Sequence, residues 1–247
     1  MNNRIVLNCT RRFAVLALSA WLAGCSSKPP TPEWQLNAKS ASDRFVAAYL
    51  GGNARLEALE FDRARRELSS TGRLDLLARL ELLRCAARVA SAVFAPCEGF
   101  DPLRSDATAE DRAYADYLRA ELTAGTASLL PASQRAVAAA LLGAGEPATQ
   151  LAAMKEPFAR LVAAGVLLQR GQASPAVLEQ AVDAASSQGW RRPLLAWLGM
   201  QLQRAEQAPG EAAAESAAEI RRRIAVVQGT PVLSPVYLAG PELPRTP

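Results

Sequence analysis

The chain contains no histidine among its 247 residues. Histidine is the most common general base in enzymes and a frequent zinc ligand, so its absence excludes the catalytic relays that depend on imidazole and most zinc sites. No glycine-rich phosphate loop, Cys-x-x-Cys pair or calcium loop occurs either. An enzyme would have to use carboxylates, tyrosines, serines, Lys39 or Lys155. We therefore predict that the chain is not an enzyme and binds no cofactor or metal ion.

The chain also has little excess charge once its first residues are set aside. It carries 28 basic and 24 acidic residues in total. Residues 1–24 contain three arginines and no acid, so 25 basic and 24 acidic residues remain from residue 25 onward. A nucleic-acid-binding domain carries a strong basic surface, which this balance does not supply. We expect no nucleic-acid partner.

Residues 1–24 have the three parts of a secretory signal peptide. Arg4, Arg11 and Arg12 form a basic start. The apolar stretch that begins at Phe13 is too short to cross a bilayer as a stable helix, and small residues follow it. Twin-arginine export through Arg11 and Arg12 is an alternative to the general secretion route.

The segment closes with Leu22-Ala23-Gly24-Cys25, which resembles the lipobox of bacterial lipoproteins. The resemblance implies that Cys25 becomes the first mature residue and carries a diacylglyceryl group, with a third acyl chain such as palmitate in many Gram-negative bacteria. Two or more acyl chains give lasting membrane attachment. Ser26 follows in place of Asp, which by the enteric sorting rule implies the periplasmic face of the outer membrane. A generic signal peptide cleaved at another small residue is the alternative.

Cys85 and Cys97 are the cysteines that remain outside the signal peptide and the lipidation position. They lie twelve residues apart in a chain expected to reach an oxidising compartment, which favours a disulfide between them. Closing a loop of this size stabilises a fold by about 3 kcal/mol through chain entropy. Two free buried thiols are the alternative, and in either case we expect a structural role.

The mature chain divides into a tether, a helical body and a tail. Residues 25–33 form a lipidated Pro/Ser-rich tether. Residues 34–229 are rich in Ala, Leu, Glu and Arg and lack alternating β-type runs, which predicts one all-α domain. Residues 230–247 contain five prolines, so they are expected to be disordered or to dock in extended form, on the domain's own groove or on a partner. The tail's apolar cluster comprises Val232, Leu233, Val236, Tyr237 and Leu238.

Capping residues and periodicity place several helices within the body. Asn53 is expected to cap a helix over 54–69, and Thr108 with Asp111 to open one over 109–123. A long helix over about 73–93 is apolar on two sides, which predicts packed neighbours on both. Its two stripes are Leu76, Leu80, Leu83 and Ala87, and Leu82, Cys85, Val89 and Ala92.

A weak internal repeat relates residues 165–170 to residues 199–204, at an offset of 34 residues. This offset is the period of tetratricopeptide (TPR) repeats, although most TPR signature positions are unfilled. Each copy is expected on the first helix of a pair, with 174–187 and 210–228 as the second helices. We therefore predict an all-α fold of stacked antiparallel helix pairs, as a TPR-like superhelix or, alternatively, an irregular helical bundle.

Trp190, Arg191 and Arg192 form the most unusual local cluster. Two arginines at a helix start oppose the helix dipole, which suggests that they bind an acidic group, such as a carboxylate, a phosphate or a partner's acidic surface. Alternatively, the arginines pair with internal acids such as Asp183 and Trp190 packs as a helix staple. Trp197, seven residues later, is expected in the core.

Glu215-Ser216 resembles the catalytic pair of lysozyme-like lytic transglycosylases, but the Gly-Leu-Met-Gln stretch that these enzymes need downstream is missing. An exposed acidic row explains Glu215 better. We expect an outer-membrane scaffold or adaptor for an envelope assembly, secretion or pilus machine, similar in architecture to helical lipoproteins such as pilotins. It would bind a protein segment on a concave surface between the first helices of successive pairs. The alternative is a peptidoglycan binder or a carboxylate-based cell-wall enzyme.

Overall fold

The computed structural model describes residues 30–229, and these form eleven α-helices and one short 3-10 helix without any β-strand. The predicted all-α fold is confirmed. The signal peptide, Cys25, most of the tether and the tail over 230–247 lie outside the described residues. Within these limits no helix is long and apolar enough to cross a membrane. The elements are α2 (Glu33–Gly51), α3 (Ala54–Ser69), α4 (Leu74–Ala90), η1 (Asp101–Leu103), α5 (Ala109–Leu118), α6 (Ala124–Ala127), α7 (Ala132–Leu141), α8 (Pro147–Ala152), α9 (Pro157–Gln169), α10 (Pro175–Ser187), α11 (Arg191–Gln207) and α12 (Glu211–Gln228).

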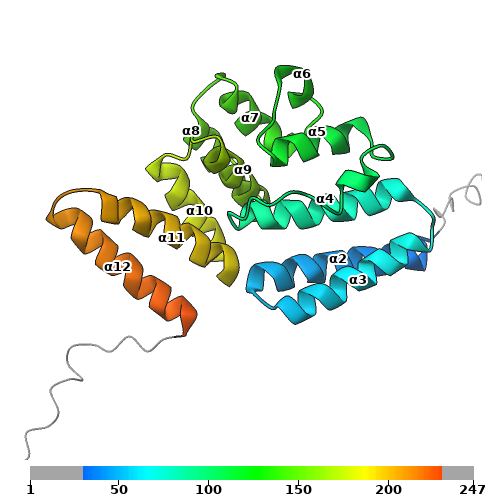
Figure 1. Cartoon of the computed structure of the whole chain (residues 1–247), viewed down its shortest axis with the longest axis horizontal. Helices are drawn as coiled ribbons and strands as arrows, with labels where there is room; N and C mark the ends of the chain where they lie inside the picture. The colour runs from blue at the N-terminus through cyan, green and yellow to red at the C-terminus, as the bar shows by residue number, and fades with distance from the viewer. Residues whose placement is uncertain (1–29, 230–247) are drawn as a thin grey trace, which may run out of the picture.

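Helix α4 lies at the centre of the molecule, with the α2–α3 hairpin on one side and helices α5 and α9 on the other (Figure 1). Both predicted apolar stripes of α4 are packed. One stripe, through Leu80, joins a cluster with Phe45 and Phe61 of the hairpin. The other stripe, through Leu82 and Cys85, joins the main core with residues of α5, α7, α9, α10 and α11. The helix predicted to have two buried faces therefore separates two hydrophobic clusters.

The last turn of α4 lies between α9 and α11. Gly165 of α9 is so close to it that an added Cβ atom would overlap the carbonyl oxygen of Val89. On the α11 side, the fully buried Trp197 donates a 2.9 Å hydrogen bond from its indole nitrogen to the carbonyl oxygen of Ala90. Carbonyl groups in the last turn of a helix have no partner within the helix, so this bond satisfies one of them. The two contacts fix α9 and α11 against one turn of α4.

The Cys85–Cys97 disulfide is present, with the two Cα atoms 5.8 Å apart. It joins α4 to the segment that leads into η1, where Phe100 is fully buried. The predicted pairing is therefore confirmed, and both cysteines are buried in the core.

Two helices end earlier than predicted because an alanine adopts the left-handed conformation after each. Ala92 has φ 55° and Ala120 has φ 60°, so α4 ends at Ala90 and α5 at Leu118. In both places the next amide closes the helix end, with Val93 donating to the Arg88 carbonyl and Glu121 to that of Asp116, each at 2.9 Å. Glycine usually occupies this position, so the sequence carried no signal for either end.

Helix starts were easier to predict, because they depend on side chains that cap locally. The Asn53 side chain accepts a 3.1 Å hydrogen bond from the Leu56 amide, and α3 begins at Ala54. The Thr108 hydroxyl accepts a 3.1 Å bond from the Asp111 amide at the start of α5. Both predicted caps are confirmed.

The internal repeat coincides with two successive helix pairs, α9–α10 and α11–α12. Helices α9 and α11 begin 34 residues apart, so Gly165 and Gly199 hold the same place in each. Their surroundings differ. Gly165 lies against α4, whereas a Cβ atom added at Gly199 would have no described atom within 4 Å outside its own helix. The spacing of the repeat is thus present in the helices, but at this position only the glycine of the first copy lies against α4.

This difference gives a matched pair of substitutions. We expect Gly165→Ala to lower the free energy of unfolding by about 1–3 kcal/mol, because the added methyl group meets a backbone carbonyl that cannot move without displacing α4. Gly199→Ala should raise it by up to about 1 kcal/mol, since alanine favours the helix and meets nothing. Urea unfolding followed by circular dichroism measures both. Similar changes in the two variants would contradict the close approach of α9 to α4.

Candidate interaction surface

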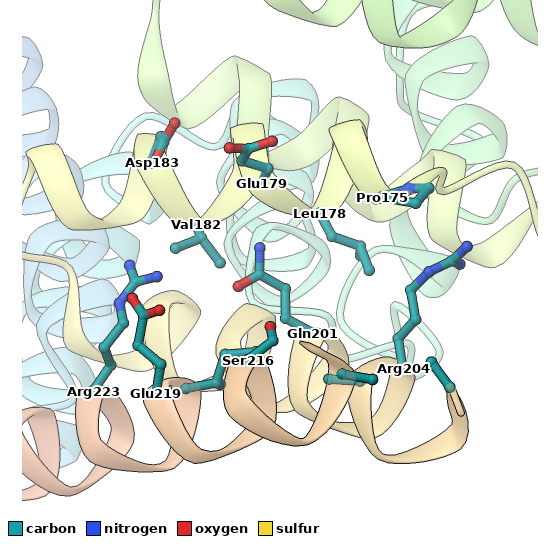
Figure 2. A pocket seen from close by; sticks show the side chains of 14 residues that line it. Pro175, Leu178, Glu179, Val182, Asp183, Gln201, Arg204, Ser216, Glu219 and Arg223 are labelled. Atoms are coloured by element: carbon teal, nitrogen blue, oxygen red, sulfur yellow. The ribbon is translucent and has the colours of Figure 1, made fainter. Parts of the chain in front are cut away.

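Helices α10, α11 and α12 line an open groove of about 480 Å³. Figure 2 shows the α10 and α12 ribbons on either side of it, with Gln201 of α11 directed into the space between them. The groove exists because α11 is paired with both helices, while α10 and α12 do not close over it. This volume is in the range of known small-molecule sites.

The groove combines apolar walls with charges of both signs. Leu178 and Val182 of α10 point toward α12 (Figure 2), and Ile220 of α12 lines the opposite wall. Carboxylates come from both walls and basic groups from α11 and α12. Such a surface suits a polypeptide segment, which offers apolar side chains together with polar backbone. The charged lining residues are Glu179, Asp183, Arg204, Glu219 and Arg223.

A second hollow of about 340 Å³ continues the groove toward the end of α12. The two hollows share Glu219 and Arg223, so they form one surface along α12. Leu194 and Leu198 of α11 line the second hollow together with Val226 of α12, whose exposed fraction is 64%. We call the two hollows together the α10–α12 groove.

The groove lies between second helices of the pairs rather than between the first helices, where the concave surface was expected. The region beside the first helices, α9 and α11, is occupied by the last turn of α4, which contacts Gly165 on one side and Trp197 on the other. Because α4 occupies that space, the open surface is on the side of α10 and α12. The repeat offset could not reveal this, since α4 lies outside the repeat.

The Arg192 side chain is engaged within the chain. Its Nε donates a 2.7 Å hydrogen bond to the Tyr49 carbonyl oxygen, and its guanidinium carbon lies 4.3 Å from the centre of the Tyr49 ring. A guanidinium nitrogen is also 3.8 Å from a carboxylate oxygen of Glu57. Burial raises the pKa of Tyr49, so the ring beneath the guanidinium is a neutral phenol at physiological pH. Arg192 thus joins α11 to the α2–α3 hairpin.

Arg191 is exposed and donates a 3.4 Å hydrogen bond to the carbonyl oxygen of Gln228, the last residue of α12. Tyr49, the acceptor for Arg192, lies in the last turn of α2. The C-terminal ends of two helices therefore meet the start of α11, and their negative dipole ends compensate for arginines placed there. The alternative predicted from the sequence was pairing of the arginines with internal acids such as Asp183. Arg192 lies near the internal acid Glu57, whereas Asp183 lines the α10–α12 groove.

Trp190 is half-buried and packs against two hydrophobic clusters, one of which contains Tyr49. The structure thus places Trp190 and Arg192 at a junction of helices, and Arg191 at its rim. Binding of an external acidic partner by these three residues stays a prediction, with Arg191 the member whose side chain is exposed.

Glu215 lies on the exposed side of α12, while Ser216 lines the first hollow of the groove. Among the described residues, no group of three or more His, Cys, Asp and Glu could hold a metal ion. The residues of the groove could not be predicted from the sequence. They come from three helices, and no single segment contains a recognisable pattern of them.

The two neighbouring arginines allow a test of the junction. We expect Arg192→Met to lower the free energy of unfolding by about 1–2 kcal/mol, because it removes a charged hydrogen bond and a cation–π contact while keeping the side-chain length. Arg191→Met is the control and should change it by less than about 0.5 kcal/mol. Urea unfolding measures both. If Arg191→Met were as destabilising as Arg192→Met, the asymmetry that the contacts indicate would be wrong.

Comparison of the chain with protein-family models, with curated proteins and with solved structures found no match.

Proposed function

We propose that the protein is a lipid-anchored adaptor of a bacterial envelope, held through Cys25 on the periplasmic face of the outer membrane. In this proposal the α10–α12 groove binds a segment of an envelope protein that belongs to an assembly, secretion or pilus machine. The open groove is the observation that carries the proposal. The lipobox resemblance at Cys25 supplies the anchor.

The chemistry of the groove favours a polypeptide as its ligand. Exposed apolar surface at Val226 gives burial energy of about 25 cal/mol for each Å² of apolar surface covered. Charged side chains such as Glu179 and Arg204 lie on both sides of this surface and can select the orientation of a bound segment. An amphipathic helix or an extended segment meets both requirements.

The position of the groove also suits an anchored adaptor. Helix α2 begins at the opposite end of the molecule from α12 (Figure 1). Residues 26–32 span at most about 25 Å when fully extended. A lipid on Cys25 would therefore keep the start of α2 near the membrane, while the groove would face away from it and toward periplasmic partners.

The carboxylates in the groove support one alternative ligand. Glu179 and Asp183 on α10 and Glu219 on α12 bring acidic groups from both walls. Carboxylates are good hydrogen-bond acceptors for sugar hydroxyls, so a peptidoglycan strand is the second candidate. Its binding would depend on all three acids, whereas peptide binding depends mainly on the apolar lining.

Photo-crosslinking in native envelopes tests the adaptor proposal. A photoreactive amino acid at Gln201, which points into the groove, should capture one discrete envelope protein. The same probe at Gln203, which is exposed two residues later on α11, is the matched control and should capture none. Fractionation of the same cells should place the wild-type chain with the outer membrane, and the Cys25→Ser chain in the soluble or inner-membrane fractions.

Cys9→Ser serves as the control for the anchor, because Cys9 lies within the predicted signal peptide and should not affect membrane attachment. Equal crosslinking from Gln201 and Gln203 would contradict binding in the groove. Outer-membrane attachment of the Cys25→Ser chain would contradict the anchor. Retention of peptidoglycan without any protein, lost on changing Glu179, Asp183 and Glu219 to amides, would favour the alternative ligand.

A further inference from the structure

Helix α12 is less covered than its counterpart in the preceding pair. Helix α10 buries six residues because it has neighbours on more than one side, whereas α12 packs on α11 and buries only Ala217 and Ile220. Terminal units of stacked helix pairs usually need a cap over their outer surface. The part of α12 that faces the groove has no such cap within residues 30–229.

The most apolar part of the groove is next to the end of α12. Four of the eight residues that line the second hollow are Leu or Val, and Val226 and Val227 belong to the last turn of the helix. Gly229 follows with φ 76°, a left-handed conformation that ends the helix and turns the chain. The chain therefore leaves α12 beside the apolar end of the groove.

The sequence that follows matches this apolar groove in length and in chemistry. Residues 230–241 carry no charge. The tail's apolar cluster, Val232, Leu233, Val236, Tyr237 and Leu238, lies within the nine residues 230–238. Nine residues in a polyproline-type conformation extend about 28 Å. The 18-residue α12 is about 27 Å long. Prolines at 231 and 235 disfavour a helix in this segment, so we expect it to be extended.

We propose that residues 230–238 turn back at Gly229 and occupy the α10–α12 groove of their own chain. In this arrangement Val232 and Leu233 enter the second hollow beside Val226, and Tyr237 and Leu238 reach the part of the first hollow near Leu178. The tail is then the cap of α12. The tail then occupies the same α10–α12 groove that the proposed function gives to a partner, so a partner must displace the tail. The inference concerns the same groove but does not require an external partner.

A tail that occupies the groove of its own chain weakens the binding of any second ligand, because only the fraction of chains with an empty groove can bind it. This gives a test with the full chain and a fluorescent peptide of residues 230–247. We expect the peptide to bind the Val232→Asp/Leu233→Asp chain at least ten-fold more tightly than the wild-type chain, measured by fluorescence anisotropy. The Leu243→Asp chain, altered beyond the nine-residue run, should bind it as weakly as the wild type.

Adding Val226→Asp to the Val232→Asp/Leu233→Asp chain should abolish binding of the peptide, and circular dichroism checks that this variant is folded. Because the docked residues 230–238 are uncharged and the peptide's Glu242 and Arg245 lie beyond them, the affinity should change less than two-fold between 50 and 500 mM salt. Equal peptide binding by all chains, or none by the Val232→Asp/Leu233→Asp chain, would overturn the proposal.

A photoreactive residue at position 237 distinguishes the chain's own groove from that of a second copy. Crosslinks within one chain to the residues of α10, α11 or α12 that line the groove support the proposal, and crosslinks between chains or to helices outside the groove contradict it. These results are independent of the envelope experiment. A failure here leaves the groove free for a partner, and a failure to find a partner leaves docking of the tail intact.

Discussion

The structure depends on how the last turn of α4 is held between α9 and α11. Gly165 lets α9 approach the backbone at Val89, and Trp197 of α11 hydrogen-bonds the carbonyl of Ala90. These contacts involve neighbouring residues of α4, so they place α9 and α11 relative to one another through a third helix. Since α10 and α12 are both paired with α11, the place of the groove relative to the rest of the molecule depends on how α11 is held. The Cys85–Cys97 disulfide adds a covalent constraint to the same helix.

A second constraint comes from helix ends that meet. Two arginines at the start of α11 oppose its dipole, but the C-terminal ends of α2 and α12 supply the carbonyl groups that bind them. Arginines at the start of α11 are unfavourable for that helix alone, but they become favourable where the ends of α2 and α12 supply acceptors. It joins the α2–α3 hairpin to α11 through Arg192, and it joins the two ends of the α11–α12 pair through Arg191. The end of α12, from which the tail departs, therefore contacts this junction through Arg191.

Features that depend on local chemistry could be predicted from the sequence. Caps at Asn53 and Thr108 place helix starts, and the two stripes of α4 predict its two packed faces, because these signals lie within one helix. The left-handed alanines at 92 and 120 could not be predicted, since the residue type that usually marks such a turn is glycine. The partners of Arg192 and the residues of the groove were also missed. Tyr49 is more than a hundred residues away from Arg192, and the groove is built from side chains of three separate helices.

The central claim is that α4 positions the groove through α11. Trp197→Phe tests it directly, because this substitution keeps an aromatic ring in the core but removes the hydrogen bond to Ala90 and part of the buried volume of the indole ring. Amide hydrogen exchange should then become faster in α11 and α12, while α5, which packs against α4 and α9, keeps its wild-type rates. If exchange in α11 and α12 were unchanged, or if it rose equally in all helices, the groove would not depend on this contact and the account would be wrong.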